Sequence, residues 1–162
     1  YKMLTDNIVI INHVFDKCRN NDQDLLRTHD NKTYNAIMIS QLKQLNDIQE
    51  YTNSEIVIID EGQFFDDLYE FIKSELETTN KIFIVGGLSG DYQMQPIGHI
   101  VRLISLADEI YKLQAYCIKC NNGTRASFTR KKTMDNNVPS TNVLVGSDDI
   151  YEAVCRYHFY NN

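Results

Sequence analysis

The stretch from Glu55 to Phe65, EIVIIDEGQFF, constrains the fold more than any other part of the sequence. Four consecutive apolar residues, Ile56 to Ile59, stand directly before two acids, Asp60 and Glu61. An apolar run without polar alternation is typical of a strand in a parallel sheet, where helices cover both faces. The run therefore predicts a buried strand that ends at the two acids. Ligands of open α/β sheets bind beyond the carboxyl ends of the strands, so both acids are candidate site residues.

Other segments repeat the pattern of a buried strand followed by a helix. Residues 8–11 and 82–85 are apolar runs that predict further buried strands, and the second run continues into a glycine-rich loop. Residues 66–77 follow helical spacing, with acids at the start that favour a helix N-terminus. Helical spacing resumes over residues 97–113, whereas the polar residues 18–35 predict a long loop. This alternation predicts an α/β fold with a parallel sheet and right-handed crossovers.

The character of the sequence changes after Tyr116. Residues 117–162 are rich in loop-forming residues, and the only short strand signal there is TNVLVG, residues 141–146. A chain of 162 residues suits one main domain with a small appendage. We therefore expect an α/β core over residues 1–116 and a small second lobe over residues 117–162.

Composition excludes some classes of function. The formal net charge is −6, and an acidic chain is poorly suited to neutralising the phosphates of nucleic acid in a sequence-independent way. No apolar run approaches the roughly 20 residues that span a bilayer, and the first residues do not resemble a secretory signal. We expect a cytoplasmic protein that binds neither nucleic acid nor membrane. An acidic surface still permits a small anionic ligand that is held by local donors.

Two pairs of residues have the spacing of metal ligands. Cys117 and Cys120 are separated by two residues, and so are Cys155 and His158. This gap lets both side chains of a pair point at one ion, and two such pairs supply a closed tetrahedral site of the kind that holds structural zinc. Zinc-finger peptides gain about 10 to 16 kcal/mol from such binding, enough to stabilise a small lobe. The alternative is two coincidental pairs of buried or reduced residues.

The two acids at the predicted strand end have the arrangement called Walker B. An aspartate in this place can hold Mg²⁺ through its water shell, while the adjacent acid takes a proton from an attacking hydroxyl. The alternative is the acidic start of a helix, because carboxylates near a helix N-terminus are stabilising in any protein. The acids alone do not decide between these two interpretations.

Five longer segments of the sequence distinguish the Walker B interpretation from the acidic start of a helix. They are DEGQFFDDL (residues 60–68), GLSGDYQMQPIG (87–98), LADEIYKLQAYCIKC (106–120), ASFTRK (126–131) and VLVGSDDIYEAVCRYH (143–158). In order, spacing and chemistry they resemble the type II thymidine kinases, the cytosolic and viral class. The resemblance covers nearly the whole chain from about Ile8.

The resemblance implies a fold and an activity. The fold is a parallel-sheet P-loop kinase core of the RecA-like kind, which binds nucleotide, with a C-terminal lasso lobe anchored by zinc. The activity is transfer of the ATP γ-phosphate to the 5′-hydroxyl of thymidine, which gives dTMP. The implied cofactors are Mg²⁺ and structural Zn²⁺, with ATP as the phosphate donor. Members of the family are commonly homotetramers that dTTP inhibits by feedback.

The resemblance also implies roles for single residues on the phosphate side. Glu61 matches the general base, and Asp60 matches the acid on the magnesium side. The positions that match nucleotide-binding residues are Asp16, Lys17, Arg19, Asp60, Gly62 and Gln63.

On the nucleoside side, Phe64, Leu88 and Tyr92 match positions that enclose the nucleoside. Thr129 matches a residue near the 5-methyl group of the base, and Tyr151 accompanies the loop whose backbone grips the thymine. The positions that match this loop are Asn142, Val143, Leu144, Val145 and Gly146. In the same family the two metal-ligand pairs anchor the lasso.

The chain departs from the family in one respect. The family opens with a phosphate-binding loop of the form G-x-x-x-x-G-K-[ST], and these 162 residues contain no such motif. The glycine-rich residues 86–90 lack the lysine, and the resemblance assigns them to the nucleoside side. We expect an N-terminal segment to precede Tyr1. A natural protein consisting of these residues alone is predicted not to bind ATP productively.

Two other functions compete with the kinase. One is a zinc-ribbon ATPase or helicase fragment, which would hydrolyse ATP with the two acids and touch nucleic acid with the zinc lobe. The acidic net charge and the lack of a basic, aromatic-rich stripe weigh against it. The other is a non-catalytic zinc-binding module.

Overall fold

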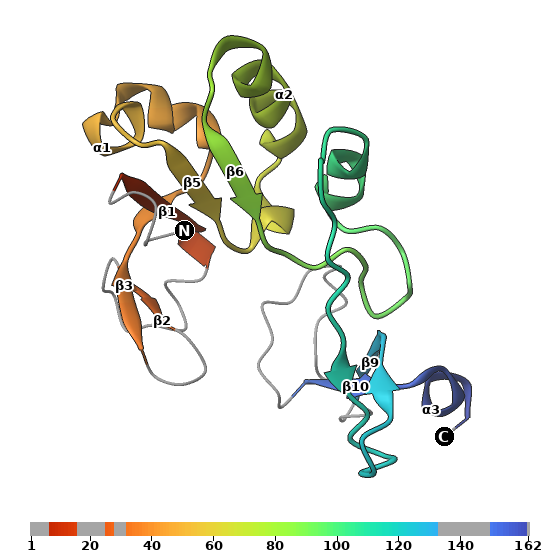
Figure 1. Ribbon diagram of the computed structural model, residues 1–162. Coiled ribbons are helices and arrows are strands. Elements are labelled where there is room, and N and C mark those ends of the chain that lie inside the picture. The colour runs from red at the N-terminus through yellow and green to blue at the C-terminus, as the bar shows by residue number, and fades with distance from the viewer. Residues whose placement is uncertain (1–6, 16–24, 28–31, 133–149, 162) are drawn as a thin grey trace. The chain divides into compact units, whose positions relative to one another are not determined.

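The computed structural model describes residues 7–15, 25–27, 32–132 and 150–161, which form a mixed α/β fold (Figure 1). The chain divides into two compact units. The first unit comprises residues 1–89 and 97–107, and the second comprises residues 90–96 and 108–162. The sequence predicts a nucleotide-binding core up to residue 116 and a zinc-anchored lobe after it. This assignment of functions to the two parts stays a prediction.

A four-stranded parallel sheet forms the centre of the first unit. Its order is β4 (Ile37–Ile39), β1 (Ile8–His13), β5 (Ile56–Ile59) and β6 (Ile82–Val85). Figure 1 shows β5 and β6 side by side with their arrows pointing the same way. In β5, Ile56, Val57 and Ile59 are buried, as the apolar run predicts. The predicted parallel α/β architecture is confirmed.

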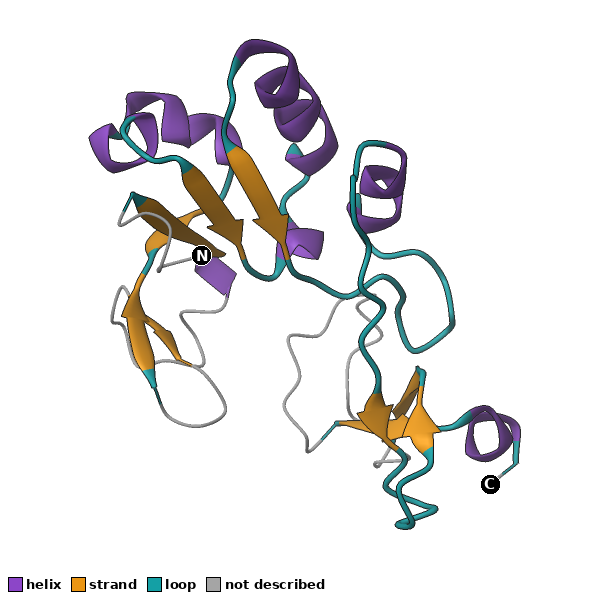
Figure 2. Cartoon of the chain, viewed as in Figure 1, coloured by secondary structure: helices purple, strands orange, loops and turns teal. Residues whose placement is uncertain are grey.

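Short helices follow the strands, as the purple segments of Figure 2 show. In chain order the helices named among the described residues of this unit are η2 (Leu42–Asp47), α1 (Gln49–Thr52), η3 (Gly62–Phe64), α2 (Leu68–Thr78) and η4 (Ile100–Ser105). Helix α2 buries Leu68, Phe71 and Ile72 in the core, which confirms the helix expected over residues 66–77. Among the described helices, none combines the length and apolar character needed to cross a membrane.

Three expectations from the sequence are wrong in detail. Strand β6 is not buried on both faces: Ile82 is 48% exposed, because β6 is an edge strand of the described sheet. Instead of the helix expected over residues 97–113, the structure has the short helix η4, which ends at Ser105, and Leu113 is 88% exposed. Residues 18–35 are not all loop, since β2 (Leu25–Arg27) pairs with β3 (Thr33–Asn35) in an antiparallel hairpin.

The second unit is built from two antiparallel ribbons. One pairs β7 (Ala115–Tyr116) with β8 (Arg125–Ala126), and the other pairs β9 (Phe128–Lys131) with β10 (Tyr151–Val154). Helix α3 (Arg156–Tyr160) follows β10 directly. The small core of this unit contains Cys117, Ala126 and Val154. The strand expected over residues 141–146 lies outside the described residues.

A carboxylate connects two helices of the first unit. Asp67 precedes α2, and its Oδ1 and Oδ2 accept the backbone N–H groups of Leu42 (3.1 Å) and Lys43 (3.0 Å). These N–H groups lie in the first turn of η2, where a helix provides no internal acceptor. Asp67 therefore caps a helix that lies 24 residues earlier in the chain.

We expect Asp67→Ala to lower the free energy of unfolding by about 1 kcal/mol, because it leaves these N–H groups without their acceptor. Urea denaturation of the two proteins measures the difference. Asp66→Ala is the matched control, since Asp66 is the exposed neighbour of the same charge. Equal losses in both variants would contradict the capping role.

Candidate functional site

Strands β5 and β6 end level with each other, and β1 continues two residues further, to His13. The backbone N–H of Asp60 donates to the carbonyl of Ile11 (2.9 Å), and the N–H of Gly86 donates to the carbonyl of Ile59 (2.8 Å). Asp60 and Glu61 therefore stand between the end of β1 and the glycine-rich loop after β6. This is the edge of the sheet where the sequence places them.

Glu61 has an unusual backbone conformation. Its φ is 50° and its ψ is 39°, the left-handed region that non-glycine residues seldom adopt. Such a conformation costs of order 1–3 kcal/mol and persists only where the surroundings enforce it. Here the next residue, Gly62, donates its N–H to the carbonyl of Gly86 (2.9 Å) and ties the turn to the neighbouring loop.

The side chain of Gln63 connects Glu61 to that loop. Gln63 is 5% exposed, and its Nε2 donates to Glu61 Oε2 at 2.5 Å. Its Oε1 accepts the backbone N–H of Leu88 at 3.0 Å. One buried amide therefore fixes both the carboxylate of Glu61 and the start of the loop that carries Leu88. The family resemblance implies a place for Gln63 beside the phosphates, and the sequence contains no signal for this bridging role.

Two glycines make room for Gln63. A Cβ at Gly87 would lie 2.5 Å from Gln63 Oε1, closer than atoms of this kind approach. At Gly98, which has a φ of +54°, a Cβ would overlap the Gln63 carbonyl. A side chain at Gly87 would displace the amide of Gln63, and one at Gly98 would displace its backbone, so the turn after β5 is packed tightly from both directions.

Aromatic rings surround His13 at the end of β1. Its ring centroid lies 4.5 Å from that of Phe15, 5.7 Å from Phe64 and 4.8 Å from Phe65. His13 is buried, and its Nδ1 accepts the backbone N–H of Phe15 (3.1 Å). Burial lowers the pKa of His13, while a hydrogen bond with the backbone of Ser40 and the charges of Asp66 and Asp67 oppose this effect. The neutral ring thus holds Phe64 against β1.

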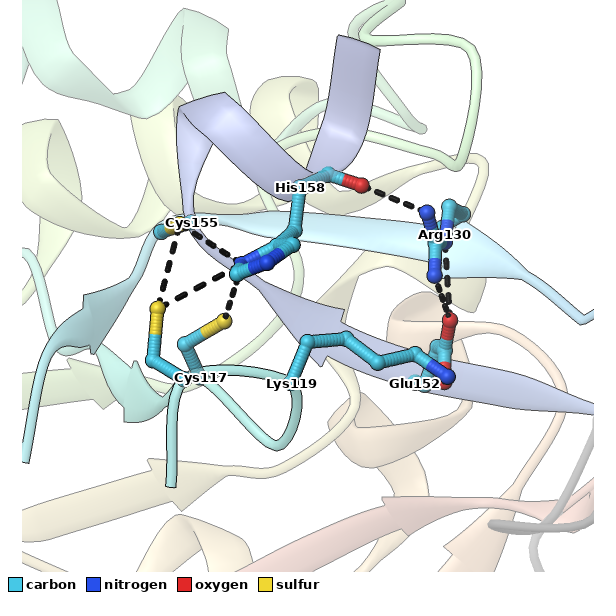
Figure 3. A network of polar contacts seen from close by, with 7 residues as sticks. Cys117, Lys119, Arg130, Glu152, Cys155 and His158 are labelled. Carbon is cyan, nitrogen blue, oxygen red and sulfur yellow. Dashed lines mark hydrogen bonds and ion pairs between the residues drawn. The ribbon is translucent and has the colours of Figure 1, made fainter. Parts of the chain in front are cut away.

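In the second unit, the four predicted metal ligands converge. Each of Cys117, Cys120, Cys155 and His158 offers one ligand atom, and these atoms all lie within 4.8 Å of one another. Figure 3 shows the sulfur atoms gathered around the imidazole of His158. The sequence prediction that the two pairs form one cluster is confirmed.

The distances within the cluster fit a tetrahedral ion. His158 Nδ1 lies 3.6, 3.3 and 3.5 Å from the sulfurs of Cys117, Cys120 and Cys155, and the last two sulfurs are 3.8 Å apart. A tetrahedral zinc with bonds of about 2.3 Å to sulfur and about 2.1 Å to nitrogen requires separations of about 3.6 and about 3.8 Å. The donor set and its spacing therefore suit zinc.

One thiol of the cluster ionises easily. Burial alone would raise the pKa of the Cys117 thiol, but N–H groups of Cys155, Cys120 and Lys119 and the ring of His158 lower it to about 6. By contrast, burial and the neighbouring sulfurs raise the pKa of Cys120. Because the thiolate is the form that binds metal, Cys117 is ready to act as a ligand near neutral pH.

A second group of predicted residues meets on the ribbon formed by β9 and β10. The rings of Tyr92 and Tyr151 are tilted by 34° with centroids 6.0 Å apart, and Lys131 Nζ lies 5.8 Å from the Tyr92 ring. Thr129 lies two residues before Lys131 in β9. Burial, with Tyr92 and Asp91, raises the pKa of Tyr151, which keeps its phenol neutral. Sequence reasoning missed Lys131 here.

The predicted residues thus fall into two sets. The structure brings Asp60, Glu61, Gly62, Gln63, Phe64 and Leu88 together in the first unit. It brings Tyr92, Thr129 and Tyr151 together in the second unit, with the metal ligands. Asp16, Lys17 and Arg19, and the segment from Asn142 to Gly146, lie outside the described residues, and their roles stay predictions.

Comparison with known proteins identifies the family. The thymidine kinase family model matches residues 1–159. The chain belongs to the thymidine kinase family. The resemblance seen in the sequence is thereby confirmed.

Individual thymidine kinases show how far the similarity extends. The chain is 36% identical over 139 residues to a thymidine kinase of Oryza sativa subsp. japonica, which covers 84% of this chain and 49% of that protein. It is 35% identical over 143 residues to thymidine kinase a of Arabidopsis thaliana, covering 86% of this chain and 58% of that protein. With a Monkeypox virus thymidine kinase the identity is 34% over 131 residues, 81% of this chain and 69% of that protein. The chain spans about half the length of the plant relatives.

The environment of His13 predicts a dependence of stability on pH. Its folded pKa lies below the ordinary 6.5, so the unfolded chain takes up the proton first as the pH falls. The neutral ring's contribution is complete above pH 6.5 and is lost as the pH falls through the folded pKa. We expect the wild type to lose stability through this residue as the pH falls from 7.5 to 5.

Urea denaturation at several pH values measures this loss. His13→Gln keeps a polar side chain without a titrating ring, so its stability should change less over the same range. Identical pH profiles for the two proteins would contradict the assignment.

Proposed function

We propose that this protein is a thymidine kinase that transfers the γ-phosphate of ATP to the 5′-hydroxyl of thymidine. Membership of the family supports the reaction class. The observation that carries the proposal is the carboxylate of Glu61, which stands at the carboxyl edge of the sheet and accepts a hydrogen bond from a buried amide (2.5 Å). A base that is held in one place suits a reaction that depends on positioning.

The chemistry assigned to Glu61 is proton removal. The 5′ oxygen of thymidine forms a bond to the γ-phosphorus, and the bond from that phosphorus to the bridging oxygen of ADP breaks. The proton of the 5′-hydroxyl passes to Glu61, and ADP leaves with the electron pair of the broken bond. A general base of this kind contributes typically about 10² to 10⁴ in rate. The products are dTMP and ADP.

Asp60 is the proposed residue for Mg²⁺. A carboxylate oxygen is a ligand that Mg²⁺ prefers. Gly86 of the neighbouring loop carries no side chain, and a Cβ there would lie 3.6 Å from Asp60 Oδ1. Bound Mg²⁺ supplies neutralisation of the phosphate charge. The proposed nucleotide-side set also keeps Gly62, Gln63, Asp16, Lys17 and Arg19.

The second unit is proposed to bind the base. Zinc in the tetrahedral cluster would hold the lobe in shape, so that the backbone from Asn142 to Gly146 can recognise thymine. Phe64 and Leu88, with Tyr92, are proposed to enclose the nucleoside, and the 53% exposed Leu88 side chain is available for contact. Backbone recognition requires a site held within about 0.5 Å, which a metal anchor can provide.

Further proposals rest on the family resemblance alone. They are a homotetrameric assembly, feedback inhibition by dTTP and a cytoplasmic location. We also propose that the protein does not bind nucleic acid. Nothing in the described residues favours the rival ATPase or helicase fragment.

We expect Glu61→Gln to lower kcat by about 10² to 10⁴, because an amide cannot accept the proton. Thymidine should still raise the melting temperature, since the substitution leaves the binding residues in place. The measurement is dTMP formation from thymidine and labelled ATP by the complete gene product.

Glu55→Gln is the matched control, because Glu55 is exposed and lies before the opposite end of β5. Undiminished turnover in Glu61→Gln would remove Glu61 from the mechanism. In the wild type, stabilisation by single-stranded DNA and none by thymidine would replace the kinase with the rival function.

We expect Cys117→Ser to lose both bound zinc and the thermal shift caused by thymidine. Serine is a poor zinc ligand, and the lobe loses its anchor when one of four ligands is removed. Metal analysis and thermal denaturation with thymidine measure the two effects. Cys18→Ser removes the cysteine outside the two pairs and should change neither. Unchanged thymidine affinity in Cys117→Ser would contradict the anchoring role.

A further inference from the structure

A group of charged residues lies beside the metal cluster. Glu152 in β10 is buried, with a side chain 5% exposed, and Arg130 in β9 is 17% exposed. Arg130 donates from Nε to Glu152 Oε1 at 2.8 Å and from a second guanidinium nitrogen to the same oxygen. Burial alone would raise the pKa of Glu152, but Arg130 and Lys119 hold it below its usual range. The carboxylate is therefore ionised and paired.

Glu152 connects this group to the first pair of metal ligands. Lys119 stands between Cys117 and Cys120, and its Nζ lies 3.3 Å from Glu152 Oε2. The backbone N–H of Lys119 also donates to the Cys117 sulfur. One carboxylate thus holds the Lys119 side chain on one oxygen and Arg130 on the other.

Arg130 connects the same group to the second pair of ligands. Its third donor, Nη1, reaches the backbone carbonyl of His158 at 2.5 Å, as Figure 3 shows. His158 lies in α3, a helix of five residues, whose last carbonyls lack partners within the helix. The guanidinium supplies a partner and fixes the backbone that carries the imidazole.

The strand register places these residues on one face of the ribbon. Arg130 pairs with Glu152, and the flanking pairs are Tyr151 with Lys131 and Ala153 with Thr129. Because neighbouring residues of a strand point to opposite faces, Arg130 and Glu152 share one face. The other face carries Thr129, Lys131 and Tyr151. The ribbon therefore has the metal cluster on one side and the proposed base-binding residues on the other.

We propose that Arg130 and Glu152 are positioning residues that hold the two pairs of metal ligands in register and, through the ribbon, fix the base-binding face. This inference rests on the proposed zinc site. A buried ion pair contributes little net stability compared with apolar residues, so orientation is the better account of its presence. Residues that orient metal ligands commonly change metal affinity about 10- to 100-fold when they are replaced.

The test is the rate at which zinc leaves the full chain when a chelator is in excess. Arg130→Met keeps the length of the side chain and removes every donor, and we expect zinc release about 10 to 100 times faster than in the wild type. Arg125→Met is the matched control, because Arg125 is exposed in β8 and should release zinc at the wild-type rate. Wild-type release from Arg130→Met, or equal acceleration in both variants, would overturn the proposal.

Two further variants separate positioning from general destabilisation. Arg130→Lys keeps the charge but lacks the planar fork of donors, so it should restore slow release only in part. Glu152→Gln is nearly isosteric and carries the test if Arg130→Met does not fold. The double variant Arg130→Met/Glu152→Gln should release zinc no faster than Arg130→Met, because both residues act in one network. Additive acceleration would overturn the coupling between them.

Cobalt provides a readout of geometry. With Co²⁺ in place of zinc, Arg130→Met should keep three thiolate ligands but show shifted or broadened visible bands, since the ligands relax from their tetrahedral positions. An unchanged cobalt spectrum would count against positioning. Neither measurement needs thymidine or ATP. A chain without kinase activity would therefore contradict the proposed function alone. Zinc release from Arg130→Met at the wild-type rate would contradict this inference alone.

Discussion

The hydrogen bonds made by the Gln63 amide hold the first unit's candidate site together. The amide accepts from the Leu88 backbone and donates to the Glu61 carboxylate, so two segments that leave different strands become one rigid surface. Its burial matters, because a buried amide without these partners would cost about 1–3 kcal/mol. The conformation in which the donor meets Glu61 is therefore strongly preferred, and the carboxylate points in one direction before any ligand arrives.

The second unit achieves rigidity by other means. It has a small apolar core, in which Cys117, Ala126 and Val154 are the buried members, and such a core cannot fix a loop by packing alone. Four ligand atoms within 4.8 Å and a buried ion pair replace the missing core. Arg130 belongs to this arrangement while its strand neighbour Thr129 faces the opposite side. Shape in this unit is thus set by directional contacts, whereas in the first unit it is set by apolar burial.

Sequence reasoning recovered what local patterns encode. The apolar run before Asp60 predicts strand β5 and its polar end, and the two C-x-x-[CH] pairs predict one cluster, because these signals lie within a few residues. The bridge from Gln63 to Leu88 spans 25 residues and leaves no periodic trace in the sequence. The same holds for Arg130 and Glu152, whose pairing depends on a strand register. The exposure of Ile82 was missed because an edge strand and a central strand can share one apolar sequence.

At position 61 the backbone conformation and the proposed chemistry of the side chain favour different residues. A residue at φ 50° is strained unless it is glycine, asparagine or aspartate, so asparagine at this position would suit the turn better than glutamate does. Asparagine is too short and has no proton-accepting carboxylate. Under the proposed role of Glu61 as the base, mutations that relax this turn would be favoured in a selection for thermal resistance and rejected in a selection for dTMP formation. Under that proposal, the strained backbone of Glu61 lowers stability in exchange for a proton acceptor at the edge of the sheet.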